Sequence, residues 1–175
     1  MHIFFICTGN ICRSPTAERL AAAYAALHEI PDLTASSAGT RAVIGHPIHR
    51  DAAHVLEQMG AHTSDFAARQ LTQKIALKAD LIIAMTREHR DIVLETAPRQ
   101  LPRTFTLMET ARLTSEFGAR TISDLAALRP RLAANELLDI PDPIGQSPEV
   151  FAAVGAQIAS LLPPIMELCR RTITA

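Results

Sequence analysis

The 175-residue sequence predicts an α/β fold, a single three-layer domain over residues 1–175 in which helices cover both faces of a four-stranded parallel sheet. Strand-like and helix-like segments alternate along the chain, as they do in proteins with parallel sheets. The segment 80–85 is continuously apolar, as expected for a strand that has helices on both sides. A chain of this length supplies one substantial core and is too short for two.

The four predicted strands are apolar or β-prone segments that end near turn residues. The first contains the run Ile3–Ile6, and the second is weak by propensity alone. The predicted strands are residues 2–7, 34–39, 80–85 and 103–108.

Helix predictions follow from apolar residues at helical spacing and from capping residues. Pro15 suits a first helical position, Gly60 a C-cap and Thr72 an N-cap. Pro163-Pro164 should kink or interrupt the last helix, because each proline lacks an N–H and clashes with the preceding turn. The predicted helices are residues 15–27, 48–60, 72–79 and 87–97, two pieces within 109–137 that place Leu125, Leu128 and Leu132 on one face, and a last helix that opens at Ser147-Pro148.

Composition narrows the functional classes. A formal net charge of −1 gives no electrostatic footprint for nucleic acid or an anionic membrane. We expect no membrane insertion, because no apolar stretch approaches transmembrane length, and no signal peptide, because the N-terminus lacks a basic region. Three cysteines do not make a disulfide framework, so we expect a cytoplasmic protein.

The most informative segment joins the first predicted strand to the first predicted helix. Residues 7–15 read Cys-Thr-Gly-Asn-Ile-Cys-Arg-Ser-Pro. A loop at this junction can wrap one phosphate with its backbone N–H groups, and the helix N-terminus adds a favourable dipole. The same field favours the thiolate form of Cys7, and Arg13 can grip two phosphate oxygens. These features predict nucleophilic attack on phosphorus by a cysteine-dependent phosphatase.

Through Asn10, Arg13, Ser14 and Pro15, this string resembles the phosphate loop of the low-molecular-weight protein tyrosine phosphatase family. The resemblance implies that Cys7 forms a phosphocysteine and that Arg13 binds phosphate. It also implies that Ser14 stabilises the thiolate and that Asn10 holds a strained loop conformation, since asparagine tolerates positive φ. Family members have a four-stranded parallel sheet, with a segment like Ser37–Thr40 after the second strand. The implied phosphate-binding residues are Thr8, Gly9, Asn10, Ile11, Cys12, Arg13 and Ser14.

A second group must protonate the leaving oxygen and then activate water, and one carboxyl group can serve both steps. Asp142-Pro143 resembles the motif that carries this acid in the family, and prolines on both sides restrict the backbone there. Asp139 is the nearby competitor, but no proline follows it. The predicted catalytic residues are Cys7, Arg13 and Asp142.

Cys12 has two interpretations that the sequence leaves open. It fills a small apolar space, or it is a resolving thiol that traps oxidised Cys7 as a disulfide, as the resemblance implies. Cys169 is predicted to be a core residue. His46, His49 and His54 form the only histidine cluster, without partners at zinc-like spacing, so we predict no metal and no cofactor.

The chain departs from the family where the substrate would lie. Ile144-Gly145 and the segment 41–44 stand where family members carry the aromatic residues that flank the substrate. Phe66 stands where a family histidine supports the loop asparagine, so Asn10 must have another partner. These departures leave phosphate chemistry intact and predict a weaker preference for phosphotyrosine peptides.

We therefore predict an enzyme that hydrolyses phosphate monoesters, with phosphotyrosine proteins or small phosphate esters as substrates and without nucleic acid as a partner. Two alternatives remain. A thiol-dependent arsenate reductase shares this loop but usually needs two further redox cysteines, and only Cys169 is left. A non-catalytic phosphate-binding or redox-sensing module would not require Cys7, Arg13 and Asp142 together.

Overall fold

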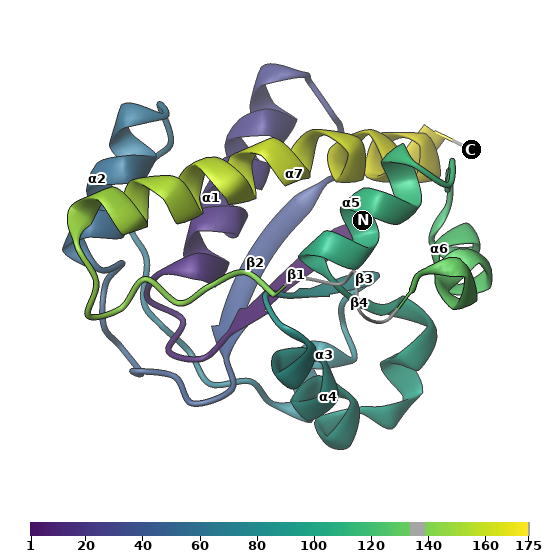
Figure 1. The fold of residues 1–175 in the computed structure, drawn as a ribbon, viewed down its shortest axis with the longest axis horizontal. Coiled ribbons are helices and arrows are strands. Elements are labelled where there is room, and N and C mark those ends of the chain that lie inside the picture. The colour runs from purple at the N-terminus through teal and green to yellow at the C-terminus, as the bar shows by residue number, and fades with distance from the viewer. Residues whose placement is uncertain (134–138, 175) are drawn as a thin grey trace.

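The computed structural model describes residues 1–133 and 139–174, and it is an α/β structure around one parallel sheet (Figure 1). The strands are β1 (His2–Cys7), β2 (Thr34–Gly39), β3 (Leu81–Ala84) and β4 (Thr104–Thr106). The helices are α1 (Arg13–Leu27), α2 (Arg50–Gln58), α3 (Gln73–Ala76), α4 (Arg87–Thr96), α5 (Leu107–Ser115), α6 (Ile122–Leu128) and α7 (Pro148–Thr174), with short 3-10 turns at Pro98–Arg103 and Arg129–Arg131.

The sheet has the strand order β2-β1-β3-β4, and every neighbouring pair is parallel. This confirms the predicted four-stranded parallel sheet. In the register, Cys7 lies beside Gly39 on β2, and Ile6 lies beside Ala84 on β3. The ends of three strands therefore meet at one edge, and the loop after β1 leaves the sheet there.

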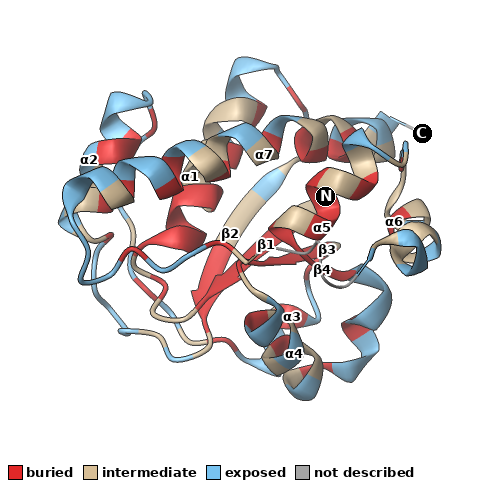
Figure 2. Cartoon of the chain, in the orientation of Figure 1, coloured by how far each residue is buried: buried red, intermediate tan, exposed pale blue. Residues whose placement is uncertain are grey.

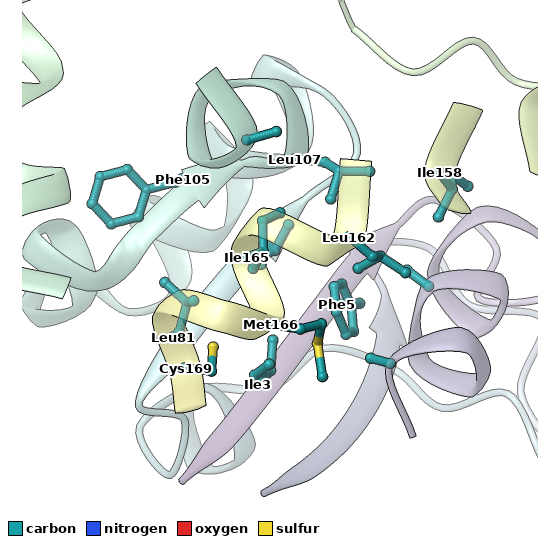
Figure 3. Packing of buried hydrophobic residues seen from close by; sticks show 14 of the residues in the cluster. Ile3, Phe5, Leu81, Phe105, Leu107, Ile158, Leu162, Ile165, Met166 and Cys169 are labelled. Atoms are coloured by element: carbon teal, nitrogen blue, oxygen red, sulfur yellow. The ribbon is translucent and has the colours of Figure 1, made fainter. Parts of the chain in front are cut away.

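Alternate residues of β1 point to opposite faces of the sheet, and each face has its own core. Ile3 and Phe5 face α1, α5 and α7, whereas Phe4 and Ile6 face α3 and α4. Strands β1 and β3 are buried almost throughout, which explains their apolar sequences, whereas the first half of β2 is partly exposed (Figure 2). Figure 3 shows the larger core, in which one face of α7 packs on the sheet through Ile158, Leu162, Ile165, Met166 and Cys169.

A third, smaller cluster joins α2 to α1 and α7. Cys12, at the end of the β1–α1 loop, packs there with Val55, Leu56 and Phe151. This packing anchors the C-terminal end of the loop to α2 and α7.

Several element boundaries differ from the sequence prediction. Helix α1 begins at Arg13 rather than Pro15, and the proline lies in the first turn, where its missing N–H is not needed. Strand β4 ends at Thr106 because Thr106 and Glu109 form a capping box that starts α5. Of the kink or interruption predicted at Pro163-Pro164, the interruption is wrong, since α7 is continuous through both prolines.

The described part of the 109–137 segment contains α5 and α6, as predicted, but Leu132 lies beyond the helical residues. Residues 134–138 of that prediction lie outside the described residues. Helix α3 ends at Ala76, earlier than predicted, and Gln100 donates to the carbonyls of Ala76 and Ala79 at 2.6 and 3.2 Å.

Contrary to the sequence expectation, α7 is long and apolar enough to cross a membrane by length and composition. A core helix passes the same test, and α7 has such a role here. Its buried residues, from Phe151 to Cys169, belong to the clusters against the sheet and against α2.

Candidate active site

The carbonyl groups of the loop between β1 and α1 accept hydrogen bonds from backbone amides of neighbouring segments. The segment after β2 supplies three of the donors, at 2.9 to 3.0 Å, and His49 supplies a fourth to Ile11 at 2.7 Å. Because the carbonyls are bonded outward, the loop N–H groups are left for an anion. Among the described residues, no acceptor bonds to the backbone amides of residues 9–12. The three bonds from the segment after β2 are Thr40 N–H to Cys7 O, Arg41 N–H to Thr8 O and Val43 N–H to Gly9 O.

Gly39 allows this close approach. A Cβ atom at position 39 would collide with the carbonyl oxygen of Thr8 and would lie 3.0 Å from the amide nitrogen of Asn10. The end of β2 can therefore seat the loop only if residue 39 has no side chain. The sequence suggested this segment by resemblance, and the structure supplies the steric reason.

The structure brings Cys7 and Ser14 together at the bottom of the site. The Sγ atom of Cys7 lies 2.9 Å from the Oγ atom of Ser14, and both residues are buried. A hydroxyl at this distance can donate to a thiolate and stabilise its charge.

Asn10 has the left-handed backbone predicted for it, with φ of 55°. Its Nδ2 group donates to Ser14 Oγ at 2.9 Å and to Ser37 Oγ at 2.7 Å, and its Oδ1 atom accepts from the Arg69 amide at 2.9 Å. Asn10 needs other partners because Phe66 stands where the family has a supporting histidine. These three bonds supply them. Phe66 instead lies beneath the guanidinium of Arg19, 5.5 Å from its ring centre.

Glu18 extends this network, and the sequence analysis missed it. The Ser37 hydroxyl donates to Glu18 Oε2 at 2.6 Å. Burial raises the pKa of the Glu18 carboxyl, and the Ser37 hydrogen bond and Arg19 partly oppose that effect. Only the packing of α1 against β2 brings Glu18 to Ser37, so no local pattern could have indicated it.

Arg13 and Asp142 form an ion pair at 2.6 Å across the mouth of the loop. Arg13 is buried, and it also donates to the carbonyl of Ile140 at 3.0 Å. The Asp142 side chain is 45% exposed, so the substrate can reach it. The predicted trio of Cys7, Arg13 and Asp142 therefore lies in one place.

The segment 139–142 is fixed to the end of β3. Ile140 donates its amide to the carbonyl of Met85 at 2.9 Å, and its side chain is fully buried. Asp139 accepts from the amide and the guanidinium of Arg87, at 2.9 and 3.4 Å. Asp139 is thus engaged at the start of α4, while Asp142 pairs with Arg13.

His89 is a second residue that the sequence analysis missed. It lies on α4, and its Nε2 atom is 2.8 Å from the Thr8 hydroxyl. Burial and, to a lesser extent, the positive charge of Arg13 lower the pKa of His89 to about 4. The imidazole is therefore neutral at physiological pH.

Cys12 is buried, and burial raises its pKa to about 12. Cys7, Cys12 and Cys169 are all free thiols. Cys169 is fully buried in the core, as predicted. Within the described ranges, no three histidine, cysteine or carboxylate side chains gather as a metal site, and His49 instead caps α2 through Asp51.

A pocket of about 220 Å³ opens above the loop. Its outer wall is aliphatic, with Val43 38% exposed and Ile144 44% exposed, and Arg41 is the exposed cation beside them. No lining residue is aromatic. The lining residues are Cys7, Thr8, Gly9, Ile11, Cys12, Arg13, Arg41, Val43, Asp142 and Ile144.

Comparison with known proteins decides which family has this site. The sequence model of the low molecular weight phosphotyrosine protein phosphatases matches residues 2–118, which include the whole phosphate loop. This chain belongs to that family. As a low molecular weight phosphatase, it is a cysteine-dependent phosphoric monoester hydrolase.

Relatives of this phosphatase match well beyond the loop. Low molecular weight protein-tyrosine-phosphatase Wzb of Escherichia coli K12 is 33% identical over 87% of this chain and 84% of its own length. The structure of a low molecular weight protein tyrosine phosphatase from T. tengcongensis is 28% identical with a TM-score of 0.78, covering 95% of this chain and 98% of that one. The YwlE arginine phosphatase from Geobacillus stearothermophilus is also 28% identical, with a TM-score of 0.74 over 95% and 90% of the two chains.

Proposed function

We propose that this phosphatase, acting as one domain in the cytoplasm, dephosphorylates protein phosphotyrosine and small aryl phosphates with Cys7 as nucleophile and Asp142 as acid and base. One observation carries the proposal: Cys7, Arg13 and Asp142 converge on a pocket whose floor is a loop of free amides. Three free thiols suit a reducing compartment.

In the first step, the Cys7 thiolate attacks phosphorus, so an S–P bond forms as the P–O bond to the leaving group breaks. Protonated Asp142 gives its proton to the leaving oxygen. The loop amides and Arg13 stabilise the charge on the transferring phosphoryl oxygens. Arg13 exchanges its bond to Asp142 for the phosphate, which frees the carboxyl group for its role as acid.

In the second step, Asp142, now a carboxylate, takes a proton from water. The oxygen of that water attacks phosphorus, and the S–P bond breaks. Inorganic phosphate leaves, and the Cys7 thiolate and protonated Asp142 are restored. The cycle balances without an oxidant, a reductant or a metal.

The walls of the pocket limit how strongly a phosphotyrosine ring is held. Aromatic walls would add a ring-pairing term of about 0.5–1.5 kcal/mol, which Val43 and Ile144 cannot supply. We therefore expect a phosphotyrosine-peptide preference about tenfold below that of family members with aromatic walls, equal to about 1.4 kcal/mol. Arg41 favours substrates with acidic residues beside the phosphate.

Phosphoarginine is a second candidate substrate. The YwlE relative is an arginine phosphatase, and aliphatic walls suit the flexible arginine stem. The exposed charge of Arg41 opposes a guanidinium at the mouth of the pocket, which is why phosphotyrosine comes first.

An assay against p-nitrophenyl phosphate, phosphotyrosine peptides and phosphoarginine peptides tests the proposal, with Cys7→Ser as the blank. We expect turnover of the two aryl substrates, and an Arg41→Ala variant should lose part of its preference for acidic peptides. A kcat/KM highest on phosphoarginine would replace the first candidate with the second. Absence of turnover on all three would overturn both.

Arsenate reduction is not supported by the placement of the third cysteine. Cys169 is fully buried on α7, and burial raises its pKa to about 12. A thiol relay needs an accessible second cysteine. Arsenate-dependent thiol oxidation by this protein would contradict this conclusion.

A further inference from the structure

We propose that His89 is a positioning residue for this phosphatase, which holds Thr8 and, through Thr8, the Arg13 guanidinium that grips phosphate. The inference rests on the proposed function, because Arg13 is assigned there as the phosphate ligand. His89 lies on α4 and belongs to none of the loop segments that line the pocket.

The imidazole is held at both nitrogens. Its Nε2 atom is 2.8 Å from Thr8 Oγ1, and its Nδ1 atom is 2.9 Å from Thr86 Oγ1. A neutral ring donates from one nitrogen and accepts at the other, and a hydroxyl can take either role. Both tautomers therefore bridge Thr86, at the start of α4, to Thr8 in the phosphate loop.

Thr8 passes this restraint to Arg13. The guanidinium has only donors, so the contact of 3.4 Å from Arg13 NH2 to Thr8 Oγ1 uses the hydroxyl oxygen as acceptor. The same NH2 group donates to Asp142 at 2.6 Å. The hydroxyl thus lies between the imidazole and the guanidinium, and its rotamer is set from both sides.

The histidine ring is not needed to cap α4. The cap uses the backbone amide of His89, which donates to Thr86 Oγ1 at 3.2 Å, and that bond survives loss of the ring. The ring nevertheless is buried, at 4% exposure of the residue. Its Nε2 atom is directed to the loop hydroxyl of Thr8, as expected if the side chain serves the site.

The charges around the ring favour its neutral form. Burial and the charges of Arg13 and Arg41 lower the pKa of the ring. Asp142 and Asp139 raise it, but by less than the other effects lower it. An imidazolium would place a second positive charge beside Arg13. The neutral ring orients Thr8 without competing with Arg13 for the phosphate.

The test is a double-mutant cycle between His89→Leu and Thr8→Val, read by the inhibition constant of inorganic phosphate and by KM and kcat on p-nitrophenyl phosphate. Each single variant should weaken phosphate inhibition and raise KM by about five- to tenfold, the size of one hydrogen bond to a charged network. Phosphate binding by the double variant should be no weaker than that of the single variant with the larger loss. His89→Gln, which keeps a polar end near Nε2, should recover most of the loss.

His54→Leu is the matched control, because His54 is an exposed histidine on α2 that bonds only to Gln58 in the described structure. It should match wild type in every readout. Melting temperatures of all variants show whether they remain folded. If His89→Leu does not fold, His89→Phe carries the test, because it keeps a buried ring but has no nitrogen to bond Thr8.

Two outcomes overturn the inference. One is a His89→Leu or His89→Phe variant that is as stable as wild type and binds phosphate as tightly. The other is a double variant in which the effects of His89→Leu and Thr8→Val multiply. Failure of the proposed function is distinguishable, because phosphate binding can be measured by titration calorimetry in a protein that hydrolyses nothing. In that case the double-mutant cycle measured by calorimetry still tests the contact between His89 and Thr8, although turnover is absent.

Discussion

Asn10 and Ser37 lie 27 positions apart in the chain, and the amide of Asn10 donates to the hydroxyl of Ser37 at 2.7 Å. This bond fastens the phosphate loop to β2, and Ser37 passes the connection to Glu18 at 2.6 Å. The loop conformation that presents its amides to phosphate therefore depends on the neighbouring strand and on α1, as well as on its own sequence.

Replacing Asn10 separates strain from hydrogen bonding. Asn10→Gly relieves the positive φ but loses three hydrogen bonds, whereas Asn10→Ala loses the bonds and adds strain of about 1 kcal/mol. We expect both variants to lose more than tenfold in kcat/KM, with the glycine variant the more stable of the two in urea unfolding. A glycine variant with wild-type activity would show that the bonds do not shape the site.

Cys7→Ser should abolish turnover while phosphate and vanadate still bind, because the cradle consists of backbone amides and Arg13. Turnover of p-nitrophenyl phosphate and inhibitor binding to the variant measure the two effects. Residual activity within tenfold of wild type would remove Cys7 from the role of nucleophile.

Asp142→Ala should slow esters with poor leaving groups most, because those need a proton on the departing oxygen in the transition state. A series of aryl and alkyl phosphates measures the dependence. Asp139→Ala is the matched control, since Asp139 is engaged by Arg87. A uniform loss across the series would indicate a structural role for Asp142, and a larger effect at position 139 would exchange the two residues.

Mild peroxide should inactivate the enzyme reversibly. Peroxide oxidises the Cys7 thiolate to a sulfenic acid, the Cys12 thiol then displaces water to form a disulfide, and a thiol reductant restores both. The pKa of about 12 keeps Cys12 protonated, so closure should be slow. Peptide mass spectrometry locates the disulfide. In a Cys12→Ala variant, Cys7 should lose its protection against over-oxidation. Over-oxidised Cys7 beside free Cys12 in wild type would leave Cys12 with its packing role against Phe151 and α2.

The buried His89 should make the fold less stable in acid. Its pKa is about 4 in the folded protein against 6.5 ordinarily, so the unfolded chain binds more protons between these values. The stability contributed at pH 7 is therefore lost as pH falls from about 6.5 to 4, by up to about 3 kcal/mol. Urea unfolding of wild type and His89→Gln at pH 7 and 4.5 measures this. Parallel pH profiles for the two proteins would contradict the prediction.

Much of the fold and the centre of the site could be predicted because their signals are local. The residues from Cys7 to Ser14 are contiguous, and the strand before them and the helix after them follow from apolar spacing. Asp142 is predicted from its proline neighbours and a family motif. Errors arose where a local signal was overlooked, as with the capping box at Thr106, or outweighed by packing, as at the two prolines inside α7.

By itself, the sequence determined the chemistry: a thiol, a guanidinium and amides on one short loop, and a carboxyl group on a proline-restricted segment. Only the tertiary structure decided which residues support them. Arg13 meets Asp142 across 129 positions, and Thr8 meets His89 across 81. Such pairs depend on strand order and on the packing of helices against the sheet, and these arise from the summed burial of many apolar side chains, which no short stretch of sequence records.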